Sequence, residues 1–313
     1  MVYQLEPLYF QVGNCCDYKS ILELETYPYP QPTLLQSNNR EFLAQPMTEL
    51  TSETYLQRLT TILNLAVGKF NLDWLSTPII ILLPQLGTID NDQYGQLYKS
   101  VYRAIPDLKK HPSCYLFPYG RAAMLLAWRH IEIMLQEKNY SSVLVLAVDS
   151  DPRITQTQYM HLPPKMLPDE SVPAAECVAL VKFTLSDNGL MRHWFSYEGQ
   201  VREKARGAAI SALFERYQKA EPTPIHHFYA PYNGIKTLTE EWANVYHQLF
   251  PCVGKHTQVV MTGARTGELG ACSGIYNILH FYERYKSGDY SHHTLQVESA
   301  EVLYRGAALY SWV

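Results

Sequence analysis

Two segments far apart in this chain have the same build, and this repetition constrains the fold more than any other feature. Residues 117–136 read FPYGRAAMLLAWRHIEIMLQ, and residues 266–285 read TGELGACSGIYNILHFYERY. Each has small residues in a turn that runs into an apolar helix, and a strand is expected beyond each helix, at residues 142–150 and 301–313. Small residues let another backbone or a ligand approach closely, and N–H groups at a helix start favour a negative charge. The repetition predicts a duplicated α/β unit with a shared site between its halves.

Hydrophobic periodicity predicts that helices and strands alternate through the rest of the chain. Residues 27–50 are expected to form a loop-rich insertion, and residues 151–173 a proline-rich crossover. A helix is expected over residues 52–70, capped by Thr51 or Ser52. Further strands are expected at residues 3–13, 78–83, 113–117, 177–185, 191–198, 225–230 and 258–261, and further helices at residues 90–105, 204–219 and 238–249. This order predicts sheets covered by helices on both sides.

Five segments of the chain resemble the thiolase-like fold of the β-ketoacyl synthases. The segments are HPSCYLFPYGRAAM (111–124), VLVLAVDSD (143–151), VPAAECVALVKFTLSDNG (172–189), TGELGACSG (266–274) and RGAALYSWV (305–313). The resemblance implies a pseudo-duplicated α/β fold with α/β/α/β/α layers. Its N-terminal half is expected at residues 1–165 and its C-terminal half at residues 166–313. The helices that begin near Arg121 and Gly270 are expected to pack together in the centre.

The chain departs from this family at the residues that carry its chemistry. Ketosynthases attack an acyl thioester with a cysteine at the first helix turn, where this chain has Gly120. The family also uses two histidines; the first position corresponds to Pro231 or Tyr232, and the second to Gly267 or Glu268. The lysine that supports the second histidine is also missing from VVMTGARTGELG, residues 259–270. The resemblance therefore implies a degenerate active site without catalytic residues of the condensing type.

Four residues near these positions have both a functional and a structural interpretation. Arg121 could bind an anionic group, such as a phosphopantetheine phosphate or a carboxylate, or form an ion pair within the turn. Glu268 could act as a general base if burial raised its pKa, or it could accept hydrogen bonds from nearby backbone N–H groups. His226 and His227 are adjacent on an expected strand, so their side chains point to opposite faces and only one can face the site.

Composition and cysteine spacing limit the partners that we expect. A net charge of −4 and a pI near 6.3 give no reason to expect a nucleic-acid partner. The six cysteines show no spacing typical of metal ligands, so neither a metal nor a cofactor is expected. The N-terminal residues lack the features of a signal peptide. The longest apolar run, residues 78–84, is too short to cross a bilayer. A cytoplasmic location without a membrane partner is the expectation.

Three hypotheses about function follow from the resemblance and its departures. The first is a non-catalytic thiolase-fold protein that binds another protein, an acyl carrier or a second copy of itself. The second is an enzyme that uses the remaining cleft for altered acyl-transfer or thioester chemistry. The third is an inactive partner subunit of an active ketosynthase.

Two further expectations come from the family. Asn233-Gly234 and Glu240-Glu241-Trp242 resemble a divergent bacterial subgroup that carries 3-oxoacyl synthase names but lacks the nucleophile. That resemblance implies an accessory role in type VI secretion with an effector as partner. In the family, the strand before the nucleophile turn pairs with its twofold copy. A homodimer is therefore expected through the corresponding residues, which are Cys114, Tyr115, Leu116 and Phe117.

Overall fold

The computed structural model describes residues 1–24, 32–37, 40–50, 53–70, 72–87, 91–137, 140–155, 172–202, 205–220 and 222–313. In this part of the chain, the principal strands lie on one continuous path in the order β10-β9-β11-β12-β8-β1-β7-β6-β4-β5. Their bounds are β1 (Val2–Val12), β4 (Ile79–Leu82), β5 (Cys114–Phe117), β6 (Val143–Ser150), β7 (Ala174–Leu185), β8 (Leu190–Gly199), β9 (Ile225–Tyr229), β10 (Gln258–Val260), β11 (His293–Ser299) and β12 (Tyr304–Trp312).

This strand order contains the same topology twice. The first set of five strands follows the path β5-β4-β6-β7-β1, and the second set follows the path β10-β9-β11-β12-β8. If the strands of each set are numbered one to five along the chain, both paths have the order 3-2-4-5-1. In each set the first three strands on the path are parallel and the remaining two pairings are antiparallel. The sets join where β1 pairs with β8. We therefore propose the turn between β7 and β8 as the boundary between the halves, later than residue 165.

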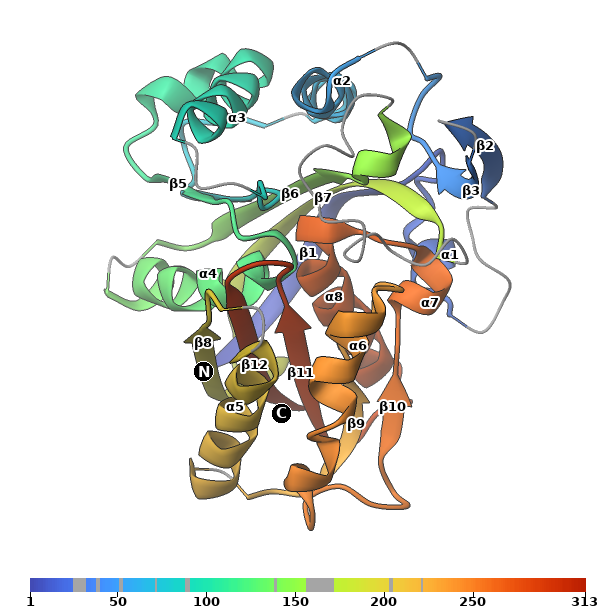
Figure 1. Cartoon of the computed structure of the whole chain (residues 1–313). Helices are drawn as coiled ribbons and strands as arrows, with labels where there is room; N and C mark the ends of the chain where they lie inside the picture. Colours follow the sequence, from blue (N-terminus) through green and yellow to red (C-terminus); the bar gives the residue numbers. More distant parts are fainter. Residues whose placement is uncertain are drawn as a thin grey trace.

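Each half-sheet has one layer of helices on its outer face, and a central layer of helices lies between the two half-sheets (Figure 1). Side chains alternate along the strands, so β4 sends Ile79 and Ile81 to one hydrophobic cluster and Ile80 and Leu82 to another. The outer helices of the first half are α2 (Tyr55–Val67) and α3 (Asn91–Ala104), and those of the second half are α5 (Arg206–Ala220) and α6 (Lys236–Ala243). This arrangement confirms the α/β/α/β/α layers.

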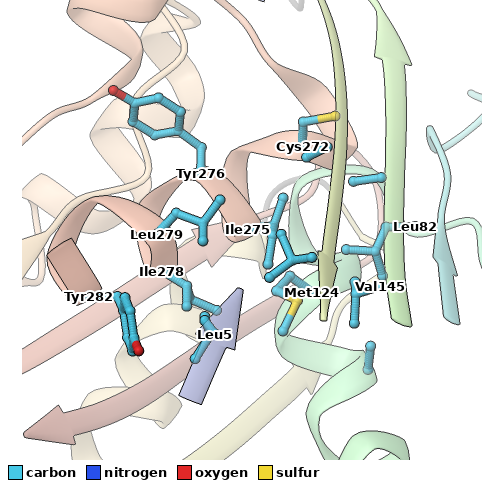
Figure 2. Close-up of a cluster of buried hydrophobic side chains, with 14 of the residues drawn as sticks. Leu5, Leu82, Met124, Val145, Cys272, Ile275, Tyr276, Ile278, Leu279 and Tyr282 are labelled. Atoms are coloured by element: carbon cyan, nitrogen blue, oxygen red, sulfur yellow. The ribbon is translucent and has the colours of Figure 1, made fainter. Parts of the chain in front are cut away.

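The central layer consists of α4 (Ala123–Glu132) and α8 (Ser273–Lys286), which are the two apolar helices of the repeated segments. Figure 2 shows α8 side chains such as Ile275 and Ile278 packed with residues of both halves. The two helices touch at Gly274, where an added Cβ would lie 2.7 Å from the Cβ of Met124. Because the missing side chain is what permits this approach, the small residues of the second segment serve packing as well as the turn.

Three sequence-based expectations need correction. Residues 27–50 contain a hairpin, β2 (Thr33–Ser37) with β3 (Arg40–Gln45), and β3 also pairs with β7. The helix expected from residue 52 begins at Tyr55. Its N-cap is Thr54, which forms a capping box with Gln57, and the caps predicted at Thr51 and Ser52 lie outside the described residues.

The third correction concerns the second repeated segment. The sequence suggested that residues 301–313 form the strand after α8, but β11 comes first and β12 is the last strand. The signal of β11 was weak because it carries Gln296 and Glu298, both fully buried, in place of apolar residues. None of the helices within the described ranges has the length and apolarity needed to cross a bilayer.

Candidate functional site

The two repeated turns face each other at the centre of the molecule, and each holds a glycine in the left-handed region. Gly120 has φ 53° and Gly270 has φ 51°, a conformation that other residues rarely adopt. A Cβ on Gly270 would lie 2.0 Å from Asp149 Oδ2, whereas a Cβ on Gly120 would lie 3.2 Å from Glu301 Oε2. Asp149 is near the end of β6 and Glu301 follows β11, so each turn faces a carboxyl group from the fourth strand of one half.

A pocket of about 70 Å³ lies between these turns. Four acidic residues, Asp149, Asp151, Glu268 and Glu301, line it together with Gly120 and Gly270. The rest of the lining is Tyr55, Pro84, Gln85, Gly87, Ser150, Pro152, Arg153, Asn233, Ile235 and Val302. The pocket therefore has a carboxyl-rich floor at the place where the sequence predicted a shared site.

Arg121 is held in a buried ion pair rather than presented to a ligand. Its Nη1 donates to both carboxylate oxygens of Glu268, at 2.8 and 2.9 Å, and its Nη2 donates to the carbonyl of Tyr232 at 3.2 Å. Glu298 Oε2 lies 3.8 Å from the same Nη2. Burial acts to lower the pKa of Arg121, but Glu268, Glu298 and Glu301 together raise it above its usual value. Arg121 therefore forms a structural ion pair, although its partner Glu268 lies in the second turn rather than in the same turn.

Glu268 serves the backbone as well as the ion pair. The N–H of Gly270 donates to Glu268 Oε1 at 2.7 Å, which satisfies one of the free N–H groups at the start of the helical segment that continues into α8. Asp149 performs the same role one residue later, since the N–H of Ala271 donates to Asp149 Oδ2 at 2.6 Å. Two carboxyl groups thus cap the second turn, as the structural interpretation of Glu268 expected.

Asp149 is enclosed and fully hydrogen-bonded. The backbone N–H of Ser150 and the hydroxyl of Tyr55 both donate to its Oδ1, at 2.8 and 3.0 Å. Burial raises the pKa of Asp149 well above its usual value, against the lowering effect of the hydrogen bonds from Ala271 and Tyr55. Burial and the neighbouring Asp149 also raise the pKa of the Tyr55 hydroxyl, so this group stays protonated and remains a donor.

Glu301 differs from the other three carboxyl groups of the pocket because no other residue in the described part of the chain donates a hydrogen bond to it. It lines the pocket and is partly accessible. Burial is the main cause that raises the pKa of Glu301 to about 7, and repulsion from Glu268 adds to it. A carboxyl group with such a pKa can take up or release a proton near neutral pH.

Neither a thiol nor an imidazole lines the pocket among the described residues. Burial raises the pKa of Cys114 to about 11, and it raises that of Cys272, whose thiol donates to the carbonyl of Cys177 at 3.3 Å. The ring of His226 stacks on His292 with centroids 4.1 Å apart, and the ring of His227 stacks on Tyr290 at 3.5 Å. Both histidines are packed away from the pocket.

The structure brings only part of the predicted site together. Gly120 and Glu268 line the pocket, and Arg121 and the Tyr232 carbonyl lie directly behind it. Gly267 is a support residue: it has φ 82°, and a Cβ there would lie 2.5 Å from the carbonyl of Pro173. Pro231 is buried and lies outside the lining.

The site also contains residues that sequence reasoning did not select, namely Tyr55, Asp149 and Glu301. Asp149 gave a signal, because it is an acidic residue at the end of an otherwise apolar strand. Glu301 gave none, because it was taken as the first residue of the last strand. No group of three or more histidine, cysteine or acidic residues among those described is placed to hold a metal ion.

Comparisons with known proteins support this fold. The chain matches no family model and no curated protein. A ketosynthase from module 6 of the bacillaene synthase of Bacillus subtilis 168 is similar with a TM-score of 0.62 and 9% identity, over 100% of this chain and 72% of the other. OleA from Xanthomonas campestris is similar with a TM-score of 0.58 and 10% identity, over the full length of both chains.

A third similar structure is a type II polyketide ketosynthase in complex with its acyl-carrier protein, with a TM-score of 0.59, 10% identity and 100% of both chains covered. At these identities the likeness concerns the fold alone. The chain therefore has the thiolase-like fold of the ketosynthases.

Proposed function

We propose that this chain is a non-catalytic, ketosynthase-like protein that acts by binding a protein or an acyl carrier. One observation carries the proposal. Gly120, at the turn where the resemblance places the nucleophilic cysteine, has no side chain to attack a thioester. A cysteine at such a helix start is activated because the N–H groups there stabilise its thiolate. The described lining of the pocket contains no thiol that could replace this cysteine.

The charges around the pocket also oppose the condensing reaction. Asp149, Glu268 and Glu301 line it, whereas Arg121 is paired with Glu268, and Arg153, also in the lining, is paired with Asp151. A malonyl group is itself a carboxylate, so the acidic lining disfavours its entry. Stabilisation of a thioester oxyanion needs preorganised donors, whereas the N–H groups of Gly270 and Ala271 are already bound to carboxyl oxygens.

The test is incubation of the protein with acyl and malonyl thioesters of a carrier protein, followed by intact-mass spectrometry and product analysis. We expect no acyl adduct and no new carbon–carbon bond. Alkylation of the exposed Cys16 by iodoacetamide is the positive control for detection of a modified thiol. A stable acyl adduct on Cys114 or Cys272 would overturn the proposal.

A second candidate function rests on Glu301. Its pKa of about 7 suits a general acid or base, which would allow altered thioester chemistry, such as hydrolysis, without a covalent intermediate. Thioester hydrolysis by the wild type that Glu301→Gln reduces by at least about 100-fold would support this function. Equal rates for the two proteins would exclude it.

Two features bear on partners. The similar ketosynthase that was solved with its acyl-carrier protein supports an acyl carrier as a possible partner here. The strand β5 is at the end of the strand path, which supports the proposed homodimer. The carbonyls of Ser113 and Phe117 accept from β4. By the alternation of a parallel ladder, the backbone groups of Cys114 and Leu116 therefore face outward. The type VI secretion role, the partner-subunit role and the cytoplasmic location remain predictions.

A further inference from the structure

An apolar groove adjoins the acidic pocket and shares part of its wall. The groove has a volume of about 440 Å³ and is lined mostly by aromatic and aliphatic side chains. Gln85, Gly87 and Val302 line both the groove and the pocket, so the two spaces are adjacent. The remaining lining of the groove is Leu86, Tyr94, Gly95, Tyr98, Pro118, Tyr119, Val201 and Leu303. A ligand with an apolar body could lie in this tyrosine groove while its polar head entered the pocket.

Two polar groups of the pocket lack a partner within the described residues. The first is the Glu301 carboxyl, which receives no hydrogen bond from another residue. The second is the side-chain Nδ2 of Asn233, a residue that is only 1% exposed. The Oδ1 of Asn233 is occupied, since it accepts from the N–H of Ile235 at 3.0 Å. A buried donor without an acceptor is costly, so this pair of groups indicates a ligand that brings a donor and an acceptor together.

The charge balance decides which donor fits. The carboxyl groups of Glu268, Glu298 and Glu301 all act on the guanidinium of Arg121. Two other guanidinium groups are already paired: that of Arg153, in the pocket lining, with Asp151 at 2.8 Å, and that of Arg305 with both carboxylate oxygens of Glu241 at 2.8 to 3.0 Å. A neutral donor would leave the Glu301 carboxylate with only the long-range attraction of Arg121 and Arg305, which are bonded to Glu268 and Glu241, whereas an ammonium group would be a direct countercharge.

We propose that the pocket binds the ammonium head of an organic amine, with an oxygen of the ligand accepting from Asn233 and an apolar body in the tyrosine groove. The inference rests on the proposed function only in taking the pocket as a binding site rather than a condensing site. An acyl adduct would refute the proposed function but would leave this inference standing. A failure to bind amines would refute this inference but would leave the proposed function standing.

The experiment is calorimetric titration at pH 8, where Glu301 is ionised, with three related compounds. Phenylalaninol carries an ammonium group, a hydroxyl and an aromatic ring; 3-phenylpropanol lacks the ammonium group, and 2-phenylethylamine lacks the hydroxyl. We expect phenylalaninol to bind, 3-phenylpropanol to bind at least about tenfold more weakly, and 2-phenylethylamine to lie between them.

Matched variants test the residues. Glu301→Gln is expected to weaken phenylalaninol binding by about tenfold or more and to leave 3-phenylpropanol binding unchanged. Glu240→Gln makes the same charge change at an exposed site and is expected to leave both affinities unchanged. Asn233→Ala should weaken phenylalaninol more than 2-phenylethylamine. The inference is overturned if phenylalaninol does not bind at millimolar concentration, if 3-phenylpropanol binds equally well, or if Glu301→Gln, shown by circular dichroism to be folded, retains full affinity.

Discussion

Replacement of Arg121 by Met tests the central feature of the site, the buried ion pair behind the pocket. The guanidinium is 3% exposed and holds Glu268, with Glu298 nearby, so its removal leaves buried carboxylates without a countercharge. Breaking a buried pair in this way costs about 3–5 kcal/mol. That is a large part of the about 5–15 kcal/mol by which a domain is usually stable. We expect Arg121→Met to lower the free energy of unfolding by this amount at pH 8, measured by urea denaturation with circular dichroism.

The pH dependence of the stability of Arg121→Met distinguishes the loss of an ion pair from a simple packing defect. Burial already raises the pKa of Glu298 in the folded state and Arg121 acts against that shift, so removal of Arg121 raises this pKa further. The folded protein then binds protons that the unfolded chain does not, so the variant regains stability as the pH falls from 8 towards about 5. Arg121→Met/Glu268→Gln should recover part of the loss at pH 8.

Arg129→Met is the matched control, because the side chain of Arg129 is 61% exposed and its nearer partner, Glu137, is also exposed. Its other partner, Glu132 at 4.0 Å, keeps an ion pair with Arg192. Its cost should stay within about 1 kcal/mol. The reasoning fails if Arg121→Met costs no more than this control, or if its deficit is the same at pH 8 and pH 5.5.

Two further changes test the core and the assembly. Gly274→Ala places a Cβ 2.7 Å from that of Met124 and should lower the free energy of unfolding by about 1–3 kcal/mol. The control Gly207→Ala adds a Cβ in open space on α5 and should raise the free energy of unfolding by up to about 1 kcal/mol. Equal effects of the two changes in urea denaturation would contradict the packing argument. Leu116→Pro removes an outward N–H of β5 and should convert the proposed homodimer to a monomer in sedimentation velocity, with its circular dichroism spectrum unchanged; a monomeric wild type at micromolar concentration would contradict the assembly.

The sequence predicted those parts of the fold in which local pattern and tertiary environment agree. The helices after Gly120 and Gly270 are apolar over most of their length, and the burial of most of their side chains follows from that composition. The strand β11 escaped prediction because Gln296 and Glu298 occupy core positions. They are stabilised by partners elsewhere in the chain, such as Asn277, whose Nδ2 donates to Glu298 Oε1 at 2.6 Å. Periodicity reports hydrophobicity along one element and carries no information about such partners.

The candidate site, too, was predictable from the sequence only where local pattern determines it. The turn glycines were identifiable because small residues cluster there in both segments, and a positive φ demands glycine. The importance of Glu301 could not be seen, because it depends on the return of the chain from β11 to the first turn, far away in sequence. Its pKa near 7 likewise arises from burial and from Glu268, which only the folded chain brings close.

The two glycine turns correspond in topology but differ in the space that each leaves for a side chain. At Gly270 the Asp149 carboxylate occupies the place of any side chain, so that turn is closed to substitution. At Gly120 there is more space, since a Cβ would lie 3.2 Å from Gln85 and Glu301, although the φ of 53° would still strain any other residue. A cysteine placed there would face Glu301 rather than an imidazole, and a neighbouring carboxylate disfavours the thiolate. A single replacement at this turn is therefore not expected to give condensing activity, because the residues around it would have to change as well.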